Sequence, residues 1–327
     1  MPDGGFVHTL SVVVPVYQGE RTLRPLLAEL APLASGGTTP AGHAYRVTEV
    51  VLVHDGGPDG SPAVMRALAA EHAFVRALFL SRNYGQHPAT LAGMASTSGE
   101  WAVTLDEDGQ YDPAEIPALL DVALAEGSHL VYGVPRNPPP HGLLRNAASR
   151  LAKAAFGALL GSGAARFSSF RLVWGEVARS LAAYSGTGVY LDVALSWVVG
   201  AGTTCPITAR GEGGRRSGYT LRKLLAHFWR MVLTSGTRPL QFIAWLGVVS
   251  VLFAALLAGW AVWQKLTNQV PVQGWTSLVI VVSFFSGCIL LSLGILAEYL
   301  GLTVSAALGR PLYLVVSRAA REASRKP

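Results

Sequence analysis

The sequence has few charged residues and almost no cysteine. Only 14% of its 327 residues are Asp, Glu, Lys or Arg, whereas a typical soluble domain has roughly 25%. This composition excludes an intrinsically disordered chain, an acidic tail and a fibrous repeat. The two cysteines, Cys205 and Cys288, lie in different regions, and the second stands in an apolar stretch. They exclude a disulfide framework and a zinc site made from cysteine alone.

Charges are missing altogether from two long stretches, residues 239–264 and 266–297. Each stretch is longer than the roughly 20 residues that cross a bilayer as a helix. We therefore expect two transmembrane helices, at residues 239–264 and 275–297. The region before them contains no linker and no internal repeat, so residues 1–219 are expected to form one cytoplasmic catalytic domain.

Basic residues predict how the chain is oriented in a membrane. Lys265 is the one basic residue of the connection between the two stretches. We therefore expect both termini, including a tail at residues 298–327, to lie in the cytoplasm. The net charge of +6 then serves this topology and anionic lipid rather than nucleic acid. The basic residues that flank the stretches are Arg222, Lys223, Arg230 and Arg238 before the first, and Arg310, Arg318, Arg321, Arg325 and Lys326 after the second.

Residues 220–238 have the pattern of an amphipathic helix. Leu221, Leu224 and Phe228 share one helical face, while Arg222 and Arg230 fall elsewhere. A helix of this kind next to a membrane span is expected to lie in the bilayer interface. A helix that faces the core of the soluble domain is the alternative.

Short β-branched runs alternate with helical patterns in the first part of the chain. This alternation implies an α/β fold with a mostly parallel sheet and helices on both faces. In such a sheet, ligands bind beyond the carboxyl ends of the strands. The expected strands are residues 10–17, 47–53, 74–80 and 101–105, and the expected helices are residues 22–33, 61–72 and 88–96.

Acidic and polar residues follow each expected strand and should converge on one edge of the sheet. Asp106 and Asp108 come directly after the apolar strand at residues 101–105. A carboxylate pair at that place can hold a divalent cation that also binds phosphate oxygens, and both Mg²⁺ and Mn²⁺ suit oxygen ligands. A solvated turn is the alternative.

A basic segment at residues 136–150 supplies a second candidate site. Arg145 and Ser149 are four residues apart, so in a helix they would be neighbours on one face and could grip a phosphate together. A basic helix that contacts lipid headgroups is the alternative. The two interpretations are compatible, because a lipid phosphate has to be met at the membrane surface.

Four segments stand in order along the chain: SVVVPVYQGE at 11–20, DGGPDGS at 55–61, SRNYGQH at 81–87 and TLDEDGQYDP at 104–113. Together they resemble the inverting family 2 glycosyltransferases that use nucleotide sugars, and most closely the polyprenyl-phosphate glycosyltransferases. SSFRL at 168–172 is similar to the acceptor-side motif of that subgroup. The resemblance implies a GT-A-like fold and transfer of one sugar from a nucleotide diphosphate sugar, with UDP favoured, to a polyprenyl phosphate.

The resemblance also implies roles for individual residues. Around the nucleotide it places Pro15, Tyr17, Glu20, Asp55 and Arg82. Around the metal ion and the diphosphate it places Asp106, Asp108 and Gln110, and around the acceptor phosphate Arg136, Arg145 and Ser149, while Arg171 matches the arginine of the Phe-Arg-Leu element.

Some positions depart from the family pattern. His54 and Gly57 replace two members of the nucleotide-binding turn, and Gly109 stands where the metal segment has leucine. The family also has an Arg-x-x-Gly-x-Ser-Lys-Tyr element, which residues 210–219 match only in part. Arg210, Arg215 and Arg216 are therefore all candidates for its functional arginine. Two other functions are therefore considered: a processive polysaccharide synthase, whose Gln-x-x-Arg-Trp element is missing from the sequence, and a catalytically inert membrane scaffold. Homo-oligomerisation is left open.

Overall fold

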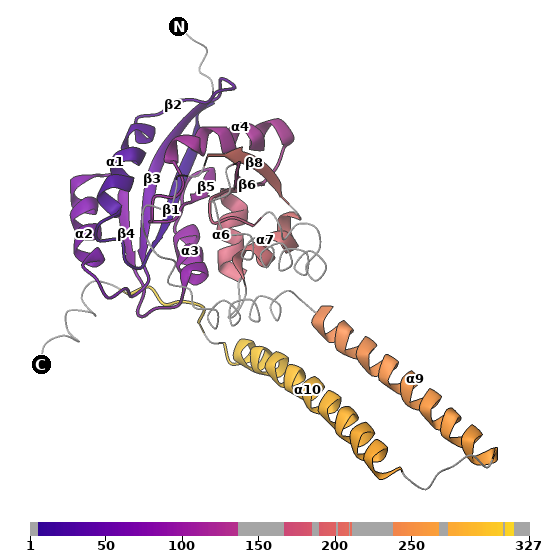
Figure 1. Ribbon diagram of the computed structural model, residues 1–327. Helices are drawn as coiled ribbons and strands as arrows, with labels where there is room; N and C mark the ends of the chain where they lie inside the picture. Colours follow the sequence, from indigo (N-terminus) through magenta and orange to yellow (C-terminus); the bar gives the residue numbers. More distant parts are fainter. Residues whose placement is uncertain are drawn as a thin grey trace, which may run out of the picture. The chain divides into compact units, whose positions relative to one another are not determined.

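The structure is a computed structural model that describes residues 6–136, 167–184, 190–200, 202–208, 210, 238–267, 274–309 and 311–316. The chain divides into two compact units. The first unit consists of Met1–Tyr219 together with Pro311–Pro327, and the second of Thr220–Arg310. The first unit contains the sheet (Figure 1).

Four parallel strands form one half of the sheet. In spatial order they are β4 (Val75–Phe79), β3 (Ala44–His54), β1 (His8–Val16) and β5 (Trp101–Thr104). The β-branched runs of the sequence predicted all four, and the observed bounds differ from the predicted ones by a few residues at most. The two-residue strand β2 (Gly37–Thr38) pairs antiparallel with the start of β3.

The other half of the sheet contains a strand that runs against its neighbours. Strand β7 (Arg171–Trp174) lies between β5 and β6 (Leu130–Pro135) and is antiparallel to both, while β8 (Thr203–Ile207) is parallel to β6. The sheet of the described residues is therefore mixed. Six of its eight strands nevertheless run in the same direction, and β2 and β7 run against them, so the predicted parallel majority is confirmed.

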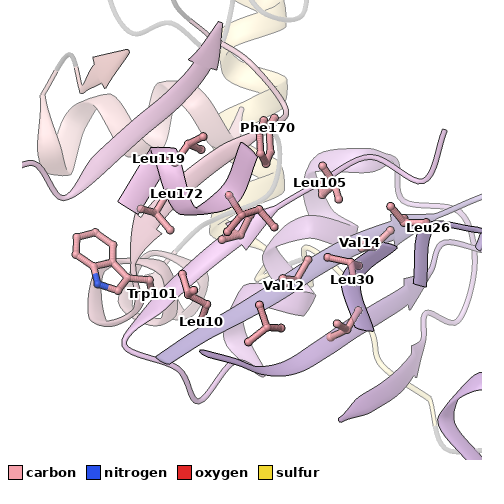
Figure 2. Packing of buried hydrophobic residues seen from close by; sticks show 14 of the residues in the cluster. Leu10, Val12, Val14, Leu26, Leu30, Trp101, Leu105, Leu119, Phe170 and Leu172 are labelled. Carbon is pink, nitrogen blue, oxygen red and sulfur yellow. The ribbon is translucent and has the colours of Figure 1, made fainter. Parts of the chain in front are cut away.

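Helices cover both faces of the sheet, as predicted. Along β1, Val12 and Val14 belong to one buried cluster and Val13 to the other, because successive side chains of a strand point to opposite faces. Figure 2 shows Val12 and Val14 in the first cluster, with Leu26 and Leu30 of a covering helix. The first face carries α1 (Leu23–Ala34), α2 (Ser61–Glu71) and α4 (Ile116–Glu126), preceded by the short helix η1 (Pro113–Glu115), and the second carries α3 (Gln86–Ala95), α6 (Gly175–Tyr184) and α7 (Leu191–Val199).

The second unit contains two long helices, α9 (Arg238–Leu266) and α10 (Trp275–Ala307). Helix α10 continues beyond residue 297, where the sequence analysis ended the second span. By length and hydropathy, the described residues contain one candidate membrane span, Phe284–Gly301, and a shorter apolar stretch, Gly247–Leu257, in α9. The predicted first span, residues 239–264 in α9, is therefore unconfirmed. The predicted interfacial helix falls, apart from Arg238, outside the described residues.

After α10 the chain returns to the sheet of the first unit. Leu80, just after β4, forms an antiparallel bridge with Val315. Two hydrogen bonds flank the bridge: the Ser81 amide donates to the carbonyl oxygen of Leu314, and the Val316 amide donates to that of Phe79, both at 2.9 Å. Residues 311–316 thus form part of the same folded unit as β4.

Candidate active site

The parallel strands bring their following segments to one edge of the sheet, which we call the rim. Residues 17–20 follow β1, Asp55 follows β3, residues 81–85 follow β4 and residues 106–108 follow β5. Hydrogen bonds between these segments, described below, confirm that the acidic groups converge there. The rim is therefore assembled from four separate parts of the chain.

Asp106 is held in place by two side chains from other elements. The amide of Gln86, at the start of α3, donates to Asp106 Oδ1 at 2.6 Å, and the hydroxyl of Ser169 donates to Oδ2. Ser169 reaches the rim because β7 is antiparallel, so that its beginning lies beside the end of β5, where the Thr104 hydroxyl donates to the Ser169 carbonyl oxygen. The sequence predicted Asp106 but neither of the residues that hold it.

The environment of Asp106 raises the pKa of its carboxyl group. Burial is the largest cause, and the negative charge of Asp108 adds to it, while the Ser169 hydroxyl, the charge of Arg171 and the Gln86 amide oppose the rise. Burial makes the carboxylate form of this group costly, and the charge of Arg171 offsets that cost only in part. A cation bound at the rim would offset it further.

Glu107, between the two aspartates, has a different task. Its carboxylate accepts hydrogen bonds from the backbone amides of Tyr17 and Gln18, the latter at 2.9 Å. It therefore ties the segment after β1 to the segment after β5. A sequence offers no signal for such a contact, because the partners are backbone groups about 90 positions away.

Asp55 is buried and braced by the segment after β4. Its two carboxylate oxygens accept hydrogen bonds from the amides of Tyr84 and Gly85, at 2.7 and 2.8 Å. Burial raises the pKa of Asp55, and the two amide hydrogen bonds oppose that rise. Each carboxylate oxygen has a second lone pair that can accept a hydrogen bond from a ligand.

Glu20 links the segment after β1 to the start of α2. Its carboxylate accepts from the Gly60 amide at 3.0 Å, while its own amide donates to Asp59 at 3.1 Å. The hydroxyl of Ser61 donates to Asp59 and accepts from the Gly19 amide. The predicted nucleotide residues Glu20 and Asp55 are thus fixed parts of the rim. Tyr17 is exposed and Pro15 is half-buried in β1.

Two departures from the family pattern have a steric reason. A Cβ atom at position 57 would lie 1.5 Å from the carbonyl oxygen of Tyr17, so only glycine fits there. Gly109 has a φ of +72°, a conformation that glycine adopts without strain. His54 is fully buried next to Phe79, so it belongs to the core rather than to an exposed nucleotide turn.

Arg171 does not project freely from the rim. It is 3% exposed and forms a buried ion pair with Asp192 of α7, and the Tyr132 hydroxyl donates to the same carboxylate at 3.1 Å. Its Nε has no hydrogen-bond partner among the described residues. Arg171 therefore joins β7 to α7 through the ion pair. Its positive charge also opposes the rise in the pKa of Asp106.

The remaining candidates are placed as follows. The Arg82 guanidinium lies over the ring of Tyr84, 4.4 Å from its centroid, and the side chains of Gln110 and Arg136 are exposed. Arg210 forms ion pairs with Asp112 at 2.7 Å and Glu29 at 2.8 Å, and its amide donates to the carbonyl oxygen of Gln110. Arg145, Ser149, Arg215 and Arg216 lie outside the described residues.

The rim fits a divalent cation that is shared with a ligand. Within the described ranges, no group of three or more His, Cys, Asp or Glu side chains forms a complete metal cage. Mg²⁺ usually binds through one or two carboxylates together with substrate phosphates rather than in such a cage. Asp106 and Asp108 provide two carboxylates at one place, and the negative charge of Asp108 helps to raise the pKa of the buried Asp106.

Comparison with known proteins gives the class of protein. Residues 11–173 match the family described as Glycosyl transferase family 2. The chain thus carries a domain of this family and is a glycosyltransferase. Similar curated proteins are the undecaprenyl-phosphate 4-deoxy-4-formamido-L-arabinose transferases of Yersinia enterocolitica and Edwardsiella ictaluri. Each is 28% identical and covers 96% of this chain and 95% of its own length.

Solved structures with a similar fold include glucosyl-3-phosphoglycerate synthase from Mycobacterium tuberculosis. Its complex with Mn²⁺, UDP and glucosyl-3-phosphoglycerate has a TM-score of 0.51 at 21% identity and covers 71% of this chain and 80% of its own. A complex of the same enzyme with Mg²⁺ and UDP also has a TM-score of 0.51 and 21% identity, covering 71% and 79%. These likenesses support the GT-A-like fold.

Proposed function

We propose that this glycosyltransferase moves a single sugar from a nucleotide diphosphate sugar, with UDP favoured, to the phosphate of a polyprenyl carrier, with inversion at the anomeric carbon. The observation that carries the proposal is the rim, where the braced Asp55 and the pair Asp106 and Asp108 stand together. Relatives named as undecaprenyl-phosphate sugar transferases match 96% of the chain, which supports a polyprenyl phosphate as the acceptor.

The donor half of the site follows from the rim. Asp55, Glu20 and Tyr17 would contact the nucleoside, and Arg82 and Gln110 would lie near the diphosphate. Asp106 and Asp108, with Gln110, would hold Mg²⁺ or Mn²⁺. When bound, such an ion neutralises negative charge on the departing nucleotide diphosphate. Ser169 and Gln86 orient Asp106 in advance, so that its carboxylate need not reorganise during the reaction.

The acceptor half rests on basic residues. A phosphate monoester is already ionised at neutral pH, so the acceptor needs positioning rather than deprotonation by a strong base. Arg136, Arg145 and Ser149 are proposed to hold it. Arg171 is proposed to act indirectly. Its guanidinium is paired with Asp192, and its positive charge favours the ionised form of Asp106.

Membrane topology supports two spans. Because residues 311–316 bond to the sheet of the first unit, they lie on the same side of any membrane as that sheet. The chain between them would therefore cross an even number of times, and a span in α10 would require another span. Helix α9 has 29 residues, which makes it about 43 Å long, and it exposes Trp245, Leu256 and Trp260. We propose that α9 is the other span and that both termini lie in the cytoplasm.

The test is a product analysis with purified protein in detergent. A panel of nucleotide sugars is offered with undecaprenyl and dolichyl phosphates, and the products are examined by mass spectrometry and NMR. We expect one sugar on one polyprenyl phosphate, with inverted anomeric configuration. A polymer would support a processive synthase, the absence of turnover with every donor would support an inert scaffold, and retained configuration would contradict the proposed mechanism.

A further inference from the structure

Residues 311–316, which we call the return segment, contact the sheet beside the rim. The Ser81 amide donates to the Leu314 carbonyl oxygen and the Val316 amide to the Phe79 carbonyl oxygen. Leu312 and Tyr313 pack against the buried cluster on the α3 face. We propose that the return segment positions the donor-binding loop, residues 81–85, and thereby helps to bind the nucleotide sugar. This inference rests on the proposed function of the rim.

The loop connects the return segment to Asp55 in a few steps. The Ser81 hydroxyl and the Tyr84 hydroxyl share a hydrogen bond of 2.8 Å. The amides of Tyr84 and Gly85 then donate to the two carboxylate oxygens of Asp55. Leu80 is fully buried, and its amide donates to the His54 carbonyl oxygen, directly before Asp55. Fixing the start of the loop therefore limits how Asp55 can move.

The loop needs such support because of its place in the sheet. Strand β4 pairs with β3 along one edge, and the sheet path contains no further named strand on its other edge among the described residues. An unpaired edge leaves a row of backbone N–H and C=O groups without strand partners. The return segment covers the end of that edge where the donor-binding loop begins, as Figure 1 shows beside β4.

The bridge geometry identifies the variant that tests the proposal. Leu80 and Val315 form the type of antiparallel pair whose hydrogen bonds belong to the flanking residues. Val316 donates a hydrogen bond to β4, whereas the Val315 amide points away from it. Val316→Pro removes one donor, and Val315→Pro is the matched control with proline at the adjacent position. Val316→Ala is a second control that shortens the side chain and keeps the amide.

The experiment measures nucleotide binding and loop protection on the full chain in detergent. Calorimetric titration with the UDP-sugar should show affinity weakened by up to about fivefold in Val316→Pro, because a hydrogen bond within the protein can pass on to binding at most its own free energy. Affinity should be unchanged in both controls. The KM for polyprenyl phosphate should stay the same. Hydrogen exchange of residues 81–85 should quicken in Val316→Pro alone.

Two outcomes would overturn the inference. If donor affinity and exchange in residues 81–85 are the same in Val316→Pro as in the controls, the return segment does not position the loop. If all three variants lose stability and both substrates equally, its role is only structural. Failure of the wild-type protein to bind any nucleotide sugar would instead contradict the proposed function, and the exchange data would still report on the contact.

Discussion

Asp106 is a carboxyl group whose protonation couples stability to pH. Its raised pKa means that the folded chain holds the proton more tightly than the unfolded chain. Its contribution is therefore most favourable below the ordinary pKa of aspartate and is lost as pH rises through the raised value. In buffer without divalent cations, the stability of the wild-type protein should therefore fall as pH rises. We expect Asp106→Asn to reduce this fall in stability and to raise the midpoint of thermal unfolding at neutral pH.

Thermal unfolding in detergent across about pH 4 to 8 checks this expectation. Glu71→Gln is the matched control, because Glu71 lies on the exposed side of α2 and its pKa is lowered by its hydrogen bond with Arg24. That variant should keep the fall in stability with rising pH. A wild-type protein whose unfolding midpoint does not change over this range would contradict the expectation.

The carboxylates of Asp106 and Asp108 should both be indispensable for sugar transfer. Asp106→Asn and Asp108→Asn each remove charge at the rim, and the loss of one interaction used mainly in the transition state lowers the rate about 10²- to 10³-fold. Both variants should stay folded, as judged by circular dichroism, and Glu71→Gln should retain activity. The measurement is the rate of sugar transfer with Mg²⁺ or Mn²⁺. Activity that resists EDTA and both substitutions would show that no metal ion acts there.

At the scale of elements, one buried ion pair joins β7 to α7. Arg171 and Asp192 are both nearly inaccessible to solvent. Removing one partner leaves the other charge buried and unpaired, which typically lowers the free energy of unfolding by about 3 to 5 kcal/mol. We expect this loss for Arg171→Met, measured by chemical unfolding in detergent. The double variant Arg171→Met/Asp192→Leu should recover much of it, and additive losses would contradict the interpretation.

The elements also show which parts of the fold a sequence reveals. The parallel half was predictable because β1, β3 and β5 are β-branched runs that end at turns. Strand β7 was not, since four residues carry no information about strand direction. The rim aspartates were predictable from their position after a strand. The contacts of Ser169 and Glu107 were not predictable, because they depend on the antiparallel strand and on distant backbone amides.

At the scale of the whole molecule, the return segment constrains topology. A position in the first unit and a position in the return segment should lie on the same side of the membrane, and the connection after α9 on the other. We expect Glu71→Cys and Pro311→Cys to react with a membrane-impermeant maleimide from the cytoplasmic side, and Thr267→Cys from the opposite side. Cys205 and Cys288 are replaced by serine beforehand. Labelling of the first two positions from opposite sides would contradict an even number of spans.

The return segment also fixes the order in which the protein can be completed during synthesis. The sheet strands of the first unit leave the ribosome early, but residues 311–316 follow only after α9 and α10 have been made. Domains fold progressively from the N-terminus during translation, so the edge at Leu80 stays uncovered until both helices have emerged. A nascent chain that stalls before its last helix is finished therefore has a sheet without its final partner. Completion of the sheet edge beside the rim is thereby delayed until both long helices have been made.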